Sequence, residues 1–165
     1  MTIPCVGRWE DGAMQIDEAD RRILRVIQER PGLTMRELGD ETGLSHTPCW
    51  RRLQRLQEAG IVSEKRYIVD PEAVGFEIVA FCFVKIVEHR RERLQEFERA
   101  VAFVPEILQC YSLSGDHDYL LQVVSRSVRD YEATVKNALT ELPNVRSIST
   151  SFTLKRVKAT TYIPV

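Results

Sequence analysis

The chain has 165 residues, of which 44% are hydrophobic and 28% are charged, and its formal net charge at pH 7 is -1. This composition is typical of a globular protein with a buried core and excludes a disordered chain. Because the net charge is close to zero, nucleic-acid binding would have to rest on a local cluster of positive charge. The four cysteines are widely spaced and form no Cys-x-x-Cys pair, which favours buried thiols over a zinc site or a disulfide framework.

Two helices are expected near the start of the chain. The first begins after Asp17, which can accept hydrogen bonds from the free N–H groups of the first turn, and ends at the Pro-Gly pair 31–32. The second begins with a capping box of Thr34 and Glu37 and ends at Gly43, which suits the left-handed conformation. The pattern therefore predicts two consecutive short helices.

A third helix carries the local positive charge. Ser45 can cap it, Gly60 can end it, and residues 45–59 include three arginines but a single acidic residue. Helices joined by a Gly-containing turn, with arginine and amide groups on the outer face of the last one, are typical of a helix-turn-helix that enters the major groove of DNA. At about 100° per residue, the outward positions are Thr47, Arg51 and Gln54, flanked by His46, Trp50, Arg52 and Arg55.

The short β-rich segment 61–69 predicts a two-stranded wing with Lys65 and Arg66 near its tip. A wing beside the phosphates would add salt-sensitive affinity that does not depend on base sequence. Amphipathic helices with outward arginines also occur in proteins that bind other proteins. The pattern alone leaves that alternative open.

The second half of the chain has the order of elements of a ferredoxin-like β-α-β-β-α-β fold. Both alternating sets of side chains in the first expected strand are apolar, so both of its faces need cover. Helices cover one face of such a sheet, and the other face predicts self-association of the chain. The expected strands are 78–87, 107–113, 119–124 and 145–155, and the expected helices are 91–103 and 128–142.

The loop between the two middle strands has the sequence Gly115-Asp116-His117-Asp118-Tyr119 and is rich in turn-forming and acidic residues. The pattern alone favours a plain hairpin turn without a function. His117 stands beside two carboxylates, but most histidines in such loops are only solvated. Because His46 and His89 are distant in sequence, no metal site is indicated.

From Ile16 onward the chain resembles the Lrp/AsnC (leucine-responsive, feast/famine) family of transcription regulators. The resemblance is carried by residues 16–24, 44–53 and 56–62, by Asp70-Pro71 and Gly75, and by the match of 115–119 to the family's G-D-x-D-[YF] signature. Trp50 departs from the Leu or Val that is commoner in the family. The resemblance implies a third helix that contacts DNA through Ser45, His46, Thr47, Arg51, Arg52 and Arg55.

The resemblance also implies an amino-acid effector that lies between neighbouring domains of an oligomer. The backbone N–H groups of Gly115 and Asp116 would hold the effector carboxylate, and Asp118 would hold its ammonium group. Further candidates for this site are His117, Tyr119, Ser149, Thr150 and Ser151.

The fold class expected is α+β, with an N-terminal winged helix-turn-helix and a C-terminal ferredoxin-like βαββαβ domain. Residues 1–15 contain no long apolar run, so neither a signal peptide nor a membrane helix is expected there and the protein is expected in the cytoplasm. The expected divisions are a flexible tail at 1–15, a helix-turn-helix DNA-binding domain at 16–62, a wing and linker at 63–77, and a ligand-binding and oligomerisation domain at 78–165.

The function expected is that of a sequence-specific transcription regulator whose oligomer and DNA affinity are modulated by a small effector, without catalysis, cofactor or metal. Its expected partners are double-stranded DNA, a small amino acid, and copies of itself in a dimer and a higher assembly such as an octamer, with no membrane. One alternative is an architectural DNA-binding protein that has no effector. Another is an enzyme resembling the tetrapyrrole decarboxylases, but the sequence shows neither a nucleophile–base pair nor a nucleotide-binding loop.

Overall fold

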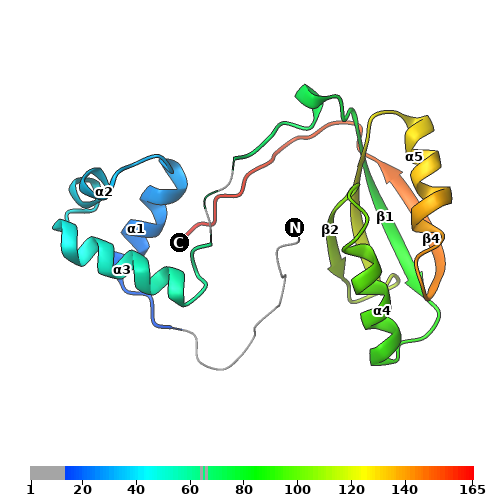
Figure 1. Cartoon of the computed structure of the whole chain (residues 1–165), viewed down its shortest axis with the longest axis horizontal. Coiled ribbons are helices and arrows are strands. Elements are labelled where there is room, and N and C mark those ends of the chain that lie inside the picture. Colours follow the sequence, from blue (N-terminus) through cyan, green and yellow to red (C-terminus); the bar gives the residue numbers. More distant parts are fainter. Residues whose placement is uncertain (1–13, 64, 66) are drawn as a thin grey trace. The chain divides into compact units, whose positions relative to one another are not determined.

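The computed structural model describes residues 14–63, 65 and 67–165, which form two compact units (Figure 1). The first unit contains the described residues up to 67 together with Lys158–Val165, and the second contains Ile68–Val157. Most of the predicted tail, residues 1–13, lies outside the described residues, and so does Arg66. Within the described ranges, no helix is long and apolar enough to cross a bilayer.

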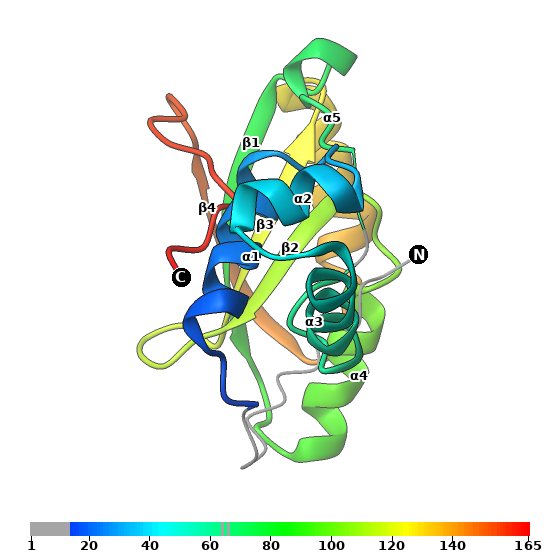
Figure 2. The ribbon, with the colours of Figure 1, turned by 90° about the vertical axis from the view of Figure 1, so that its left-hand side faces the viewer.

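Three helices form the first unit: α1 (Glu18–Glu29), α2 (Met35–Thr42) and α3 (His46–Glu58). Asp17 caps α1 as predicted, and Thr34 and Glu37 form the predicted capping box of α2. Gly43 ends α2 with a φ of +69°, which confirms the left-handed stop. In Figure 2, α3 is seen end-on while α2 lies across the view, which is the steep crossing of a helix-turn-helix.

The apolar faces of these helices meet in one small core, in which Ile23, Leu38 and Leu56 are buried. Gly39 lies in α2, where the turn before α3 passes over the helix. A Cβ at this position would lie 2.7 Å from the carbonyl oxygen of Leu44. The close approach of the turn therefore requires glycine at residue 39, and no local sequence pattern predicts this requirement.

Two local predictions for the first unit differ from the structure. The described residues of the segment 61–69 contain no β-strand, and Tyr67 is fully exposed, because no strand pairs with this segment. Ser45 has the extended backbone of an N-cap, but its side chain makes no capping hydrogen bond. The hydroxyl of Ser45 is therefore available at the exposed start of α3.

The end of the chain lies away from the sheet. Lys158–Val165, at the end of the expected ligand-binding domain in sequence, groups in space with the helix-turn-helix unit. Val165 packs against the core of that unit, and the backbone of Ile163 is hydrogen bonded to the side chain of Gln28 on α1. The burial of an apolar side chain on the helical core accounts for this assignment.

The second unit is an antiparallel sheet with helices on one face (Figure 1). The strand order is β2-β3-β1-β4, which confirms the predicted β-α-β-β-α-β arrangement. Instead of one helix over 128–142, a short α-helix runs on into a π-helical turn. The elements are η1 (Glu72–Val74), β1 (Ile78–Ile86), α4 (Arg91–Val101), β2 (Ile107–Ser112), β3 (Tyr119–Ser125), α5 (Val128–Thr134), η2 (Val135–Leu139) and β4 (Val145–Phe152).

Strand β1 has two apolar faces, as predicted. The face that carries Cys82 and Val84 is buried under α4 and α5. The opposite face carries Val79, Phe81 and Phe83, which remain partly exposed. We call this opposite side of the sheet the outer face; no described element of the chain covers it completely.

Candidate DNA interface and effector loop

The N-terminal half of α3 presents polar and aromatic side chains to solvent. His46 and Thr47 are exposed in the first turn, and Trp50 is 47% exposed one turn later. Arg51 is exposed and makes no hydrogen bond or ion pair with any described residue. An unpaired guanidinium beside hydroxyl and imidazole groups at the start of a helix can contact both bases and phosphates.

Arg52 and Arg55 are bound by the acidic start of α1. Nη1 of Arg52 lies 2.7 Å from Oδ2 of Asp17 and 2.8 Å from Oδ1 of Asp20. Nη2 of Arg55 lies 2.6 Å from Oδ2 of Asp20, which is completely buried. That these two arginines contact DNA stays a prediction, and the structure gives their guanidinium groups a further role, which is to tie α3 to α1. We call these four residues the acid–arginine clamp.

The electrostatics of the clamp favour the charged forms of Asp17 and Arg52. The backbone N–H of Asp20, followed by the Arg52 guanidinium, lowers the pKa of Asp17 to about 2. The side-chain carboxylates of Asp20 and then Asp17 raise the pKa of Arg52. The sequence contains a signal for this pairing, since Asp17-x-x-Asp20 and Arg52-x-x-Arg55 share one helical spacing.

Of the other residues predicted to contact DNA, one is half-buried, one is exposed and one lies outside the described residues. Gln54 is half-buried on α3, so its amide is less accessible than the helical periodicity indicated. Lys65 is exposed, but its predicted neighbour Arg66 lies outside the described residues. The exposed candidates at the start of α3 that form no ion pair within the described residues are therefore Ser45, His46, Thr47, Trp50 and Arg51.

The loop between β2 and β3 lies at one end of the sheet. Gly115 has a φ of +132°, a conformation that side-chain-bearing residues rarely adopt. Asp116 is exposed and forms no hydrogen bond or ion pair within the described part of the chain. The ring of His117 lies 5.2 Å from the ring of Phe83, so this histidine contacts the outer face.

Asp118 has a structural role in this loop. Its Oδ2 accepts a hydrogen bond from the backbone N–H of Ile86 at 2.7 Å, and its Oδ1 lies 2.6 Å from Nε2 of His89. These contacts, with the Ile86 N–H first, lower the pKa of Asp118. The pairing of β1 with β4 shifts register between Lys85 and Ile86, and Asp118 satisfies the N–H there. The assignment of Asp118 to an effector ammonium group stays a prediction, and such a contact would have to compete with His89 for Oδ1.

Two further effector candidates point into the helix-covered core. The Tyr119 hydroxyl donates to Oε1 of Glu98 at 2.8 Å, and the Thr150 hydroxyl lies 2.6 Å from that of Tyr131. Because side chains alternate along a strand, Ser149 and Ser151 of β4 lie on the outer face. Thr150 and Tyr119 therefore cannot share a site with these serines.

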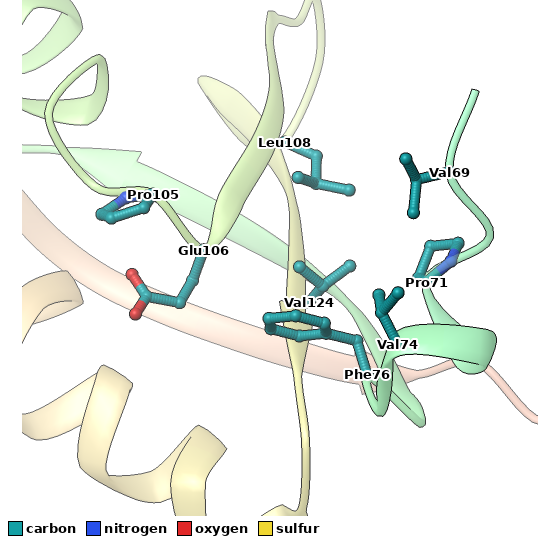
Figure 3. Close-up of a pocket in the computed structure, with 8 residues that line it drawn as sticks. All are labelled: Val69, Pro71, Val74, Phe76, Pro105, Glu106, Leu108 and Val124. Atoms are coloured by element: carbon teal, nitrogen blue, oxygen red, sulfur yellow. The ribbon is translucent and has the colours of Figure 1, made fainter. Parts of the chain in front are cut away.

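The second unit also contains a shallow pocket of about 290 Å³ that includes none of the predicted effector residues. In Figure 3 the side chains of Val74, Phe76 and Val124 gather on one side, while the carboxylate of Glu106 points away from them. The pocket is thus mainly apolar. Its lining residues are Val69, Pro71, Val74, Phe76, Pro105, Glu106, Leu108 and Val124.

Both units match known protein families. Residues 16–63 match the model of a winged helix-turn-helix DNA-binding domain, and residues 79–163 match that of the Lrp/AsnC ligand binding domain. The chain is 31% identical over 150 residues to the DNA-binding transcriptional activator DecR of Escherichia coli K12, a match that covers 91% of this chain and 99% of DecR. It is 32% identical over 145 residues to the leucine-responsive regulatory protein of Rhizobium meliloti, covering 88% and 93% of the two chains.

Solved structures agree with these matches. A transcriptional regulator of Neisseria meningitidis in complex with L-Met is 36% identical with a TM-score of 0.84, over 91% of this chain and 97% of that one. An AsnC family transcriptional regulator of Agrobacterium tumefaciens has the same identity and TM-score, over 90% and 96%. The predicted family and fold class are confirmed. The chain therefore belongs to the Lrp/AsnC family and is a transcription regulator with a winged helix-turn-helix DNA-binding domain and a ligand-binding domain.

Proposed function

We propose that this regulator recognises DNA through the first two turns of α3, with Arg51 as its base-contacting arginine. The observation that carries the proposal is that Arg51 is exposed and unpaired, whereas Arg52 and Arg55 are held in the acid–arginine clamp. An arginine can pair with guanine through two hydrogen bonds. The clamp contributes by fixing α3 against α1, which holds the contacting side chains in one orientation.

The protein is proposed to act as a dimer or a larger assembly, such as an octamer, joined through the outer face of the sheet. Val79, Phe81 and Phe83 of β1 form an apolar strip on this face, and Tyr111 of the edge strand β2, beyond β3, is also exposed. A second copy that covers this strip would bury apolar area and provide two helix-turn-helix domains related by two-fold symmetry. Such symmetry matches palindromic DNA sites. Sedimentation of the Phe81→Glu variant as a monomer would support this interface.

The proposed effector is a small amino acid. The protein is proposed to act in the cytoplasm, where its DNA lies, by binding DNA and effector without catalysing a reaction. Among the relatives, one structure is a complex with L-Met and one protein is named leucine-responsive. The Gly115 and Asp116 backbone would hold the effector carboxylate, with Ser149 and Ser151 as hydroxyl contacts. We reassign the ammonium contact from Asp118 to Asp116, whose carboxylate is exposed and unpaired within the described chain.

A mobility-shift titration tests this function directly. The DNA upstream of the protein's own gene is titrated at fixed salt, with and without L-methionine or L-leucine. A specific shift that an amino acid changes supports the effector-modulated regulator, and Asp116→Asn should remove the change while leaving the shift itself. A specific shift that no amino acid alters would indicate an architectural protein instead. Fixed salt matters because phosphate contacts make affinity strongly salt-dependent.

A further inference from the structure

The segment Lys158–Val165 docks on helix α1 of the helix-turn-helix unit. The side-chain amide of Gln28 forms two hydrogen bonds with the backbone of Ile163: Oε1 accepts from the Ile163 N–H at 2.7 Å, and Nε2 donates to the Ile163 carbonyl at 3.1 Å. One amide thus satisfies both polar groups of one residue, as a neighbouring strand would. Val165 packs against the helical core two residues later. The docking therefore combines polar and apolar contacts.

This segment is continuous with the strand that carries part of the proposed effector site. Strand β4 bears Ser149 and Ser151, and its end is held by the bond from the Thr153 N–H to the Val79 carbonyl at 2.9 Å. From there the chain reaches Lys158 within a few residues. Residues up to 163 also match the ligand-binding family model, so part of that domain's sequence folds onto the DNA-binding unit. The chain therefore connects the two units twice, once through residues 63–77 and once more where β4 runs on to Lys158.

Helix α1 connects the docked segment to the DNA-contacting helix. Gln28 lies near the C-terminal end of α1, and Asp20 near its N-terminal end binds Arg52 and Arg55 of α3. A shift in α1 would therefore be transmitted to α3 through partly buried, charge-assisted contacts. Two helices joined by charge-assisted contacts move together. Separating them would leave a charged group without its partner, which costs more free energy than moving both helices as a pair.

We propose that Lys158–Val165 is a strap that couples effector binding at β4 to the position of α3, with Gln28 as its anchoring residue. The docked strap holds α1 in the arrangement that presents Arg51 to DNA. An effector that alters the conformation at the end of β4 changes the fraction of molecules in which the strap is docked. The effector then binds the docked and undocked states with different affinity, and coupling between two sites requires such a difference. The effector part of the inference rests on the proposed function; the docking does not.

The first test measures hydrogen exchange of the Ile163 amide in the full-length protein. The Gln28→Ala variant removes both bonds to Ile163, and Glu29→Ala is the matched control, since Glu29 is an exposed neighbour on α1 with no side-chain bond to any described residue. Exchange at Ile163 should be roughly tenfold faster in Gln28→Ala and unchanged in Glu29→Ala. Equal exchange in all three proteins would overturn the docking.

The second test measures how far L-methionine and L-leucine change the affinity for the upstream DNA. The change should fall to near zero in Gln28→Ala and in a chain that ends at Val157, and should persist in Glu29→Ala. Thermal unfolding confirms that each variant is folded. An undiminished change in Gln28→Ala would overturn the coupling even if Ile163 is protected. If neither amino acid alters DNA affinity in the wild type, the effector function fails, and the exchange result alone decides whether the strap anchors α1.

Discussion

The guanidinium of Arg52 lies 2.8 Å from the carboxylate of Asp20, a residue 32 positions earlier in the chain and completely inaccessible to solvent. Both residues belong to helices that the sequence predicts correctly, yet their contact changes what Arg52 does. A buried carboxylate without partners would be strongly unfavourable. Two of the three arginines of α3 therefore neutralise Asp20, and only Arg51 among them makes no ion pair with the described residues.

Loss of the Asp20 charge should destabilise the helix-turn-helix unit. Asp20→Asn removes the charge that binds Arg52 and Arg55, and we expect the free energy of unfolding to fall by about 2 kcal/mol because charge-assisted hydrogen bonds are lost. Urea unfolding followed by circular dichroism measures the effect. The control is Glu41→Gln, which breaks an exposed pair with Arg30 and should cost less than about 1 kcal/mol. Equal losses in the two variants would contradict a structural role for Asp20.

Arg51 and Arg52 should respond differently to replacement by alanine. Arg51→Ala is expected to lower specific operator affinity by about 1–3 kcal/mol without changing the melting temperature, because its side chain is exposed and makes no hydrogen bond or ion pair within the described chain. Arg52→Ala is expected to lower the melting temperature, because it leaves Asp17 without its cation. Mobility shifts and thermal melts on the same preparations separate the two effects. Unchanged operator affinity in Arg51→Ala would refute the proposed contact surface.

Gly39 should tolerate no side chain. Gly39→Ala places a Cβ 2.7 Å from the backbone oxygen of Leu44, so the turn must move, and we expect a loss of about 1–3 kcal/mol in stability. Gly32→Ala is the matched control, since a Cβ there meets no atom within 4 Å, and its effect should stay within about 1 kcal/mol. Chemical denaturation of both variants provides the comparison. A neutral Gly39→Ala variant would mean that the turn can relax without cost.

Acid should weaken the first unit in part through Asp17. Its pKa is about 2 in the folded chain, below the ordinary 3.8, so its contribution to stability is fully present above pH 4 and is lost as the pH falls toward 2. In Asp17→Asn, which cannot titrate here, the loss of stability over this interval should be smaller. Urea midpoints at steps between pH 5 and 2.5 measure the difference. Parallel curves for the two proteins would show that Asp17 is not the titrating group.

The parts of the fold that follow from local chemistry could be predicted from the sequence. The capping boxes at Asp17 and Thr34 need only residues a few positions apart, and Gly43 needs only its own φ. The two apolar faces of β1 follow from alternation along one strand. The match of the third helix and of the 115–119 loop to a family pattern indicates the class of protein from the sequence alone.

Tertiary structure alone decided which of the candidate side chains are free to act. Arg52 is occupied by Asp20, Asp118 by the Ile86 N–H and His89, and Thr150 faces Tyr131 in the core, because each contact joins residues far apart in the chain. Periodicity assigns a side chain to a face of its own element but does not specify what lies opposite. The sequence by itself therefore determined the elements and the family of this protein, whereas only the packing of those elements determined that Arg51 remains free and that Lys158–Val165 docks on α1.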